Sequence, residues 1–212
     1  MDTMDRRDEF LLKMYEQMFN DIDRHHKIVW QVIGVLIGSF AVVALAEKEL
    51  IPIDIAVAVV ILISLWVIAH VYDSNYWYNR NLVIISNIER QFLKKEDLKE
   101  IQYYFGEHRD KNAVQTSLKI QLYVGWGLVV LFLSYHFITE IYPGFFISWA
   151  DASFDWMKMM PYIVLIVFYL KLVKWIKKKR ENDYEEFVAN SPGIEIDTSS
   201  INYGGGHPIS KK

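Results

Sequence analysis

Three stretches of this sequence, residues 28–46, 55–72 and 120–139, contain no Asp, Glu, Lys or Arg. Each is close to the about 20 residues that a helix needs to cross the roughly 30 Å hydrocarbon core of a bilayer. A fourth stretch, residues 156–176, is nearly as apolar and carries lysines near its ends. Because the bilayer offers no water to unpaired backbone groups, such stretches cross it as helices. The sequence therefore predicts an all-α integral membrane protein with four transmembrane helices, arranged as two hairpins.

The positions of Lys and Arg predict how these helices are oriented, because both residues concentrate at the cytoplasmic ends of membrane helices. Five of them precede the first stretch, seven lie in residues 73–117, and residues 177–180 are entirely basic. By contrast, residues 47–54 contain only one, Lys48, and residues 140–155 contain none. We therefore expect a multi-pass protein with both termini in the cytoplasm.

The fourth span is predicted from a shorter apolar core than the others. Only twelve residues between Lys158 and Lys171 are uncharged, a length that also suits a re-entrant or interfacial segment. Long lysine side chains can bury their methylene groups while the ammonium reaches the headgroups. We expect segment 156–176 to span the membrane fully, and the non-spanning segment is the alternative.

The same pattern divides the chain into consecutive parts. We expect a cytoplasmic amphipathic helix over 1–27, a transmembrane hairpin over 28–72, a cytoplasmic helical linker over 73–117, a second hairpin over 118–178, and a basic juxtamembrane segment with a mostly disordered cytoplasmic tail over 179–212. The second span should continue into the linker as one helix, since no Gly or Pro occurs from 53 to 105. Gly106 then ends a second helical piece of the linker, and residues 193–198 of the tail are compatible with one short strand.

Two apolar helix faces lie outside the predicted membrane spans. The residues of the first face recur at helical spacing and are Leu11, Met14, Tyr15, Met18, Phe19, Ile22 and His25. The opposite face of this helix is acidic, which favours packing against protein over binding to an anionic lipid surface. The second consists of Leu82, Ile85, Ile88 and Phe92. The first face is expected to pack on the second or on the same helix of another subunit. Either face could also bind a cytoplasmic protein partner, through Leu11, Met14, Met18 and Ile22 or through Leu82, Ile85, Ile88 and Phe92.

Within the spans, polar and small residues mark candidate packing faces. Gln31, Gly34, Gly38 and Ala41 form a small-residue stripe on the first span, whose G-x-x-x-G spacing lets helix backbones approach closely. The stripe is predicted to pack either within one subunit or between subunits. Asp54 suits the positive end of the second span, and the alternative is a cation-binding carboxylate at an outer mouth.

His136 and Glu140 are four residues apart near the outer end of the third span, so they are predicted to form a polar pair. The pair is either a hydrogen-bonded contact that fixes the helix rotation, or a pH-sensitive gate or half of a metal site, since histidine titrates near neutrality.

A basic run follows the fourth span and comprises Lys171, Lys174, Lys177, Lys178, Lys179 and Arg180. Such a run is the standard signal for a cytoplasmic helix end. It can also bind anionic lipid headgroups or another phosphate ligand.

Several classes of function are disfavoured. The middle of the first three spans carries no Asp, Glu, Lys or Arg, which argues against an ion-coupled transporter and leaves a passive pore or no conduction. The chain has no cysteine, which excludes disulfides and thiol catalysis, and no H-E-x-x-H, G-x-S-x-G, P-loop or G-x-G-x-x-G motif. We therefore expect no enzyme, no cofactor, no metal and, at a net charge of −3, no nucleic-acid partner. A membrane-embedded enzyme acting on lipids through His70, His136 or Glu140 is the least favoured alternative.

The order of elements over residues 8–95 resembles the SLATT-type and RipA-like small bacterial membrane proteins. An amphipathic helix precedes a membrane hairpin, and the second span runs into a helix with the pattern Tyr78-Asn79-Arg80-Asn81, Ile88-Glu89-Arg90 and Leu93. The second hairpin departs from the two-span pattern of these families. The resemblance implies a homo-oligomer in a bacterial inner (cell) membrane and, for the SLATT group, a pore-forming effector role in antiviral defence; it assigns no catalytic residue.

Together these observations predict an oligomeric inner-membrane protein that acts as a channel-like or membrane-perturbing effector. The alternative is a non-conducting membrane scaffold or regulatory subunit that binds a cytoplasmic partner.

Overall fold

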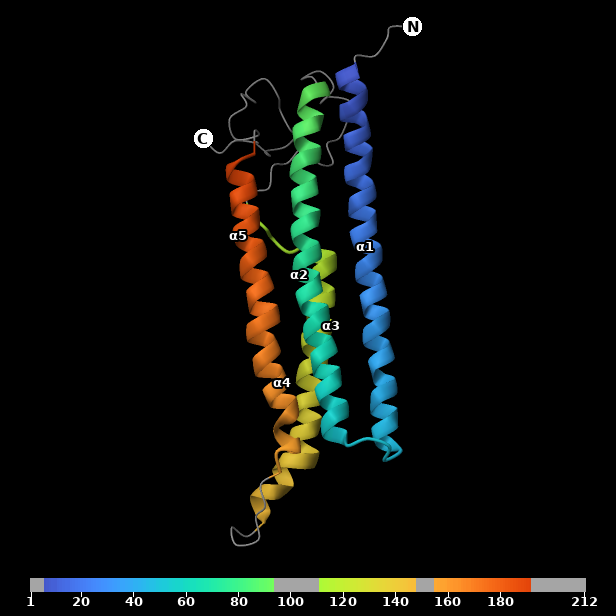
Figure 1. Cartoon of the computed structure of the whole chain (residues 1–212), viewed down its shortest axis with the longest axis vertical. Coiled ribbons are helices and arrows are strands. Elements are labelled where there is room, and N and C mark those ends of the chain that lie inside the picture. The colour runs from blue at the N-terminus through green and yellow to red at the C-terminus, as the bar shows by residue number, and fades with distance from the viewer. Residues whose placement is uncertain (1–5, 94–110, 148–154, 192–212) are drawn as a thin grey trace. The chain divides into compact units, whose positions relative to one another are not determined.

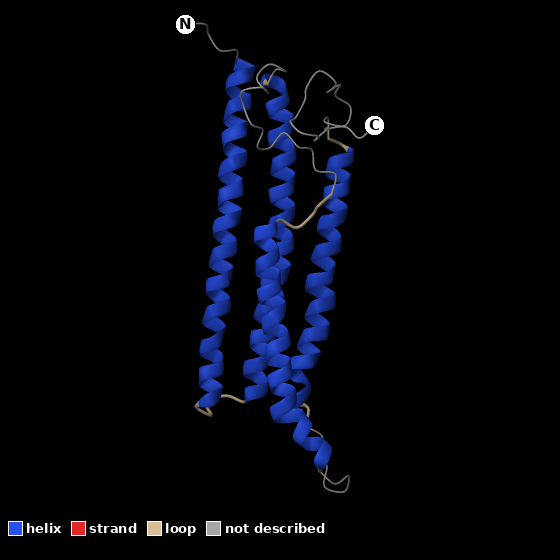
Figure 2. Ribbon diagram, turned by 180° about the vertical axis from the view of Figure 1, so that it is seen from behind, coloured by secondary structure: helices blue, strands red, loops and turns tan. Residues whose placement is uncertain are grey.

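The structure is a computed structural model that describes residues 6–93, 111–147 and 155–191 (Figure 1). The second half of the predicted linker, with Gly106, and the predicted tail from residue 192 lie outside these ranges. All regular structure in the described residues is helical (Figure 2). The helices are α1 (Arg6–Glu47), α2 (Ile53–Phe92), α3 (Thr116–His136), α4 (Met160–Phe168) and α5 (Trp175–Ala189).

Shorter segments extend these helices. A π-helical turn, η2 (Phe137–Ile141), and a 3-10 turn, η3 (Tyr142–Phe146), continue α3, and a 3-10 turn, η4 (Met157–Met159), precedes α4. A π-helical segment, η5 (Tyr169–Lys174), joins α4 to α5. Within the described ranges, four helices are long and apolar enough to cross a membrane, namely Arg6–Glu47, Ile53–Glu89, Thr116–Phe146 and Met157–Ala189. This confirms the predicted all-α class and the number of candidate spans.

The chain divides into two compact units, which are described separately. Unit 1 comprises Met1–Lys27, Ser74–Ala113 and Lys179–Lys212, and unit 2 comprises Ile28–Asp73 and Val114–Lys178.

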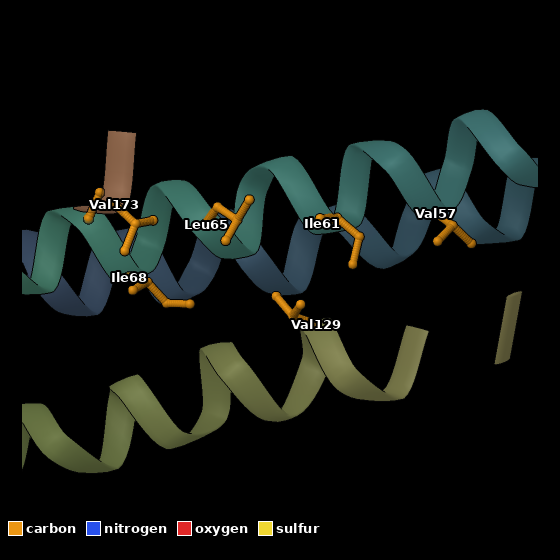
Figure 3. Packing of buried hydrophobic residues seen from close by; sticks show 7 residues of the cluster. Val57, Ile61, Leu65, Ile68, Val129 and Val173 are labelled. Atoms are coloured by element: carbon orange, nitrogen blue, oxygen red, sulfur yellow. The ribbon is translucent and has the colours of Figure 1, made fainter. Parts of the chain in front are cut away.

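Helix α2 is the most buried of the four candidate spans. In its most apolar stretch 61% of the residues are buried, against 11–22% in the other three. In unit 2, a core cluster joins Val57, Ile61, Leu65, Ile68 and Ala69 of α2 to Val129 of α3 and Val173 of η5 (Figure 3). Val32 and Leu36 of α1 pack against Val67, a further residue of α2. Helix α2 is therefore the hub on which α1, α3 and the α4–η5 stretch assemble.

Helix α3 approaches α2 closely at Gly125. A Cβ atom at this position would lie 2.9 Å from Cγ1 of Ile68 and 3.8 Å from the carbonyl oxygen of Ser64. Real Cβ atoms do not come this close to another carbon, because interiors are packed to near-crystalline density. Glycine at residue 125 therefore sets the distance between the two helices.

In unit 1, the predicted apolar stripe of the N-terminal helix packs on α2. Ile22 is buried against Leu82 and Ile85, and Tyr15, Met18, Phe19 and Tyr78 surround this cluster. The Tyr15 hydroxyl donates a hydrogen bond of 3.2 Å to Oε1 of Glu89. Of the two packing alternatives, the chain thus contains the contact with its own α2. The central residues of both faces considered for a cytoplasmic partner are consequently covered, while Phe92 at the end of α2 stays 36% exposed.

Helix α5 covers another side of α2 in unit 1. Tyr184 and Val188 of α5 are buried against Tyr76 and Val83 of α2. Tyr184 is completely inaccessible to solvent, and its ring makes an edge-on contact with that of Tyr76 at 6.5 Å between centroids.

An asparagine cluster closes this side of unit 1. The side-chain amides of Asn75 and Asn79 donate to Oδ1 of Asn112 at 3.0 and 2.8 Å, and Asn79 also donates to the carbonyl oxygen of Ala113 at 3.0 Å. The amide of Asn112 in turn donates to the carbonyl oxygen of Arg180, at 3.4 Å. Because Asn75 and Asn79 are almost fully buried, these bonds satisfy amide groups that would otherwise be costly to bury.

Candidate functional site

The most distinctive polar site of unit 2 surrounds His136, whose side chain is fully buried. Its Nε2 lies 2.8 Å from Oδ1 of Asp54, and its Nδ1 lies 3.3 Å from the hydroxyl oxygen of Tyr162. Asp54 is in the first turn of α2, His136 is the last residue of α3, and Tyr162 is near the start of α4. The site therefore joins three helices through one imidazole ring.

The position of Asp54 suits its helix. A carboxylate is stabilised at the positive amino-terminal end of a helix, and Asp54 lies in the first turn of α2. Asp54 is only 7% exposed, so its carboxylate has little contact with solvent and depends on His136 as its partner. The imidazole of His136 therefore supplies this buried carboxylate with a hydrogen-bond partner.

The chemistry of the three groups fixes the hydrogen-bond directions. An ionised carboxylate only accepts, so Nε2 of His136 carries a proton and donates it to Asp54. With this proton on Nε2, the neutral imidazole accepts at Nδ1 from the hydroxyl of Tyr162. Both ring nitrogens of His136 therefore have a hydrogen-bond partner.

The structure gives Glu140 a different partner from the predicted one. Oε2 of Glu140 lies 3.1 Å from Nζ of Lys158, which also donates to the backbone carbonyl oxygen of Glu140 at 3.1 Å. The predicted pair of His136 and Glu140 is therefore replaced by two separate pairs. The prediction used α-helical spacing, whereas the helix widens into the π-helical turn η2 directly after His136.

The described residues contain no cluster of side chains that could hold a metal ion. No group of three or more His, Asp or Glu side chains in residues 6–93, 111–147 and 155–191 lies close enough together to hold a metal ion. His70, the further histidine considered for lipid chemistry, is half-buried beside Trp66, at 5.9 Å between ring centroids. Nε2 of His70 has no hydrogen-bond partner in the described part of the chain.

The small-residue stripe of α1 faces away from the rest of unit 2. Gln31, Gly34, Gly38 and Ala41 are all exposed. Added Cβ atoms at Gly34 and Gly38 would have no described neighbour within 4 Å. Among the described residues the two glycines therefore meet no other part of their own subunit, so packing within one subunit, one of the two predicted alternatives, is not seen there.

The residues of the basic run differ in the contacts that they make. Arg180 forms an ion pair with Asp183 at 2.9 Å and lies 4.6 Å from the ring centroid of Tyr76. Lys177 lies 5.7 Å from the ring centroid of Tyr72. Lys171, Lys174, Lys177, Lys178 and Lys179 are all exposed. Three of these, Lys171, Lys174 and Lys178, make no ion pair, hydrogen bond or ring contact with any described residue.

Three of the residues that carry the family resemblance have structural partners in unit 1. Asn79 belongs to the asparagine cluster, and Glu89 accepts the hydrogen bond of Tyr15. The guanidinium of Arg80 lies 5.3 Å from the ring centroid of Trp77. Their visible role is to hold unit 1 together.

Comparisons with known proteins add one relative. No family model matches the chain, and no solved structure matches it. The chain is 24% identical to the uncharacterized protein MJ0976 of Methanocaldococcus jannaschii, over 93% of this chain and 56% of that protein. It thus spans little more than half the length of this relative. Because the relative is itself uncharacterized, the similarity does not indicate an activity for this chain.

Tyr162 and the pairing of Asp54 with His136 were missed by reasoning within single helices. The predicted topology contained a usable signal, because it places the start of the second span, the end of the third and the start of the fourth on the outer side. Polar residues at one depth are natural partners in a membrane protein, where an unpaired polar group is costly.

Proposed function

We propose that this protein is a four-span protein of the cell membrane that assembles into a homo-oligomer and acts as a channel-like or membrane-perturbing effector. Both termini lie in the cytoplasm in this proposal, as the distribution of Lys and Arg indicates. The observation that carries it is the outward-facing stripe of Gln31, Gly34, Gly38 and Ala41 on α1.

The stripe supports self-association because α1 already has a separate face for its own chain. Val32, Leu36 and Ser39 are buried, while Gly34 and Gly38 between them are open. Glycine inside a helix costs roughly 0.5–1 kcal/mol relative to alanine. In a bilayer, small residues at this spacing let two helix backbones approach closely, which offsets such a cost. A second copy of the chain is the partner that fits a face of this kind.

The packing of a single subunit limits where a pore could run. Aliphatic side chains fill the core of unit 2 around α2, and the ionisable pair at His136 is closed by its own contacts. A pathway for ions therefore belongs between subunits, beside α1, where apolar residues can close it by excluding water. A defence role would follow from the family resemblance alone.

The proposal is tested with purified protein in detergent and in liposomes. The variants Gly34→Leu and Gly38→Leu fill the open face of α1, and Gly127→Leu is the matched control, because Gly127 is exposed on α3 with no neighbour within 4 Å of an added Cβ. We expect light scattering to report a defined oligomer for the wild type and Gly127→Leu, and smaller species for the α1 variants. Ion or dye leakage should fall in parallel. A monomeric wild type, or an equal loss of the oligomer in Gly127→Leu, would count against the proposal.

A second candidate function is a non-conducting scaffold or regulatory subunit, and the solid core of unit 2 favours it. In unit 1, Phe10 and Leu12 of α1 are 62% and 39% exposed, which offers an apolar surface to a cytoplasmic protein. An oligomer that causes no leakage but retains a specific partner, and loses that partner in a Phe10→Ser variant, would select the scaffold.

A further inference from the structure

An apolar groove of about 410 Å³ opens on unit 2 where α3 faces the junction of α4 and η5. It is lined by Trp126, Leu165, Ile166, Tyr169 and Leu170. Its volume falls within the roughly 300–1,000 Å³ of known small-molecule sites. Ile166, Tyr169 and Leu170 are 58%, 40% and 48% exposed, so the groove is open on the outside of the unit.

Two lysines follow the groove-lining residues along the chain. Tyr169 begins the π-helical segment η5, which also contains Lys171 and ends at Lys174. Backbone bonds in a π-helix join residues five apart, so Lys174 comes a little more than one turn after Tyr169. Both lysines are exposed, and neither has an acidic partner among the described residues. Two exposed ammonium groups thus follow the groove within about one helical turn of its last lining residues.

The aromatic residues of the groove add polar groups that also lack acceptors. Trp126 and Tyr169 meet edge to face, with their ring centroids 5.9 Å apart. Within the described residues, neither the indole N–H of Trp126 nor the hydroxyl of Tyr169 has a hydrogen-bond partner. Aromatic side chains with one apolar and one polar end are typical of the boundary between hydrocarbon and headgroups.

We propose that this groove binds one acyl chain of an anionic phospholipid, whose phosphate lies at Lys171 and Lys174 and whose glycerol ester region reaches the hydroxyl of Tyr169. The proposal rests on the membrane location in the proposed function, but not on oligomerisation or conduction. The cytoplasmic leaflet is the one that carries anionic lipids, and each nearby Lys or Arg adds about 1 kcal/mol of attraction.

Two other occupants fit the groove less well. Free phosphate would use the lysines and leave five apolar residues without a role. A second copy of the chain packed on this face about a twofold axis would pair the patch with itself. Lys171 and Lys174 of the two subunits would then come together, and their like charges would oppose the contact. An anionic lipid satisfies the charge and the groove at once.

The experiment uses the full chain in lipid nanodiscs and native mass spectrometry, which reports bound lipids and subunit number in the same spectrum. The probes are phosphatidylglycerol and phosphatidylcholine with identical acyl chains, with inorganic phosphate as competitor. The wild type should retain phosphatidylglycerol preferentially. Lys171→Gln and Lys174→Gln should each weaken its retention about fivefold, the factor that corresponds to about 1 kcal/mol per charge.

A matched control and a groove variant separate charge from shape. Lys48→Gln removes an exposed lysine that is outside the basic run and has no described partner, so it should leave the retention of phosphatidylglycerol unchanged. Ile166→Trp fills the groove and should weaken the retention of both lipids. Equal effects of Lys48→Gln and Lys174→Gln, or displacement of the lipid by inorganic phosphate, would overturn the proposal.

The remaining outcomes are equally decisive. If Ile166→Trp lowers the subunit number and leaves lipid retention intact, a second copy occupies the groove and the lipid proposal fails. If the wild type is monomeric but retains phosphatidylglycerol, the lipid site stands while self-association fails. The lysine variants lie on the exposed surface, so they remain informative should Ile166→Trp not fold.

Discussion

A single methyl group added at Gly125 tests the packing of α3 on α2. The Cβ atom of Gly125→Ala would lie 2.9 Å from Cγ1 and 3.4 Å from Cδ1 of Ile68. Ile68 is completely buried in the core cluster of unit 2, so a shift of its side chain would disturb the packing of its neighbours. Overpacking of this kind costs about 1–3 kcal/mol, while alanine gains about 0.8–1 kcal/mol over glycine in a helix interior. The control is Gly127→Ala, two residues away on the same helix, where the added methyl meets nothing within 4 Å.

Because both variants share the gain in helix propensity, the difference between them isolates the packing cost. We expect Gly125→Ala to be less stable than Gly127→Ala by about 1–3 kcal/mol. Unfolding of the purified protein in one detergent, followed by far-ultraviolet circular dichroism, measures this difference. In an Ile68→Ala background both crowded atoms are absent, and the penalty of Gly125→Ala should vanish, as a double-mutant cycle reports. Equal stability of the two glycine variants would refute the close approach of α2 and α3.

Four further variants test three other contacts. His136→Ala leaves the buried carboxylate of Asp54 unpaired and should destabilise the protein by about 3–5 kcal/mol in the same unfolding assay. Asp54→Asn keeps a hydrogen-bond acceptor for His136 and should cost only about 1 kcal/mol. Equal losses of stability in the two variants would contradict the pairing. Burial and the neighbouring Glu89 raise the pKa of Tyr15 to about 12, so the unfolded chain ionises first, from about pH 10, and stability should fall between pH 10 and 12. A Tyr15→Phe variant should show a flatter pH dependence of its unfolding midpoint, and an unchanged slope would exclude Tyr15 as the cause. Asn112→Ala strands buried amides, each worth about 1–3 kcal/mol, and should expose unit 1 to limited proteolysis before unit 2; uniform protection would argue against the asparagine cluster.

The helices were predictable because their signals are local in the sequence. Charge-free runs of membrane length indicate candidate spans without any knowledge of tertiary contacts. The absence of Gly and Pro after residue 53 predicted that the second helix continues beyond its apolar part, and α2 does run to Phe92. The apolar spacing of Tyr15, Met18 and Ile22 likewise indicated the face of α1 that the structure buries against α2.

The polar contacts were less predictable because their partners are remote in sequence. His136 bonds to Asp54, 82 residues away, and to Tyr162, 26 residues away, whereas spacing within one helix pointed to Glu140. The stripe with Gly34 could be recognised from the sequence, but the side to which it faces could not. Helical periodicity identifies one face of a helix without identifying what that face contacts. Only the contacts of Val32 and Leu36 with α2 show that the glycines point outward.

The two surfaces proposed for binding belong to different helices of unit 2, which allows both to be used in one assembly. The small-residue stripe is on α1, whose buried residues contact α2 and α3. The lipid groove is formed by α3 and the α4–η5 stretch and shares no lining residue with the stripe. An oligomer built through α1 therefore leaves each groove open to lipid, so the number of retained lipids should equal the number of subunits. This separation of the two surfaces follows from the fold. Each of the other helices of the unit packs one side on the buried helix α2, which leaves another side of that helix available for binding.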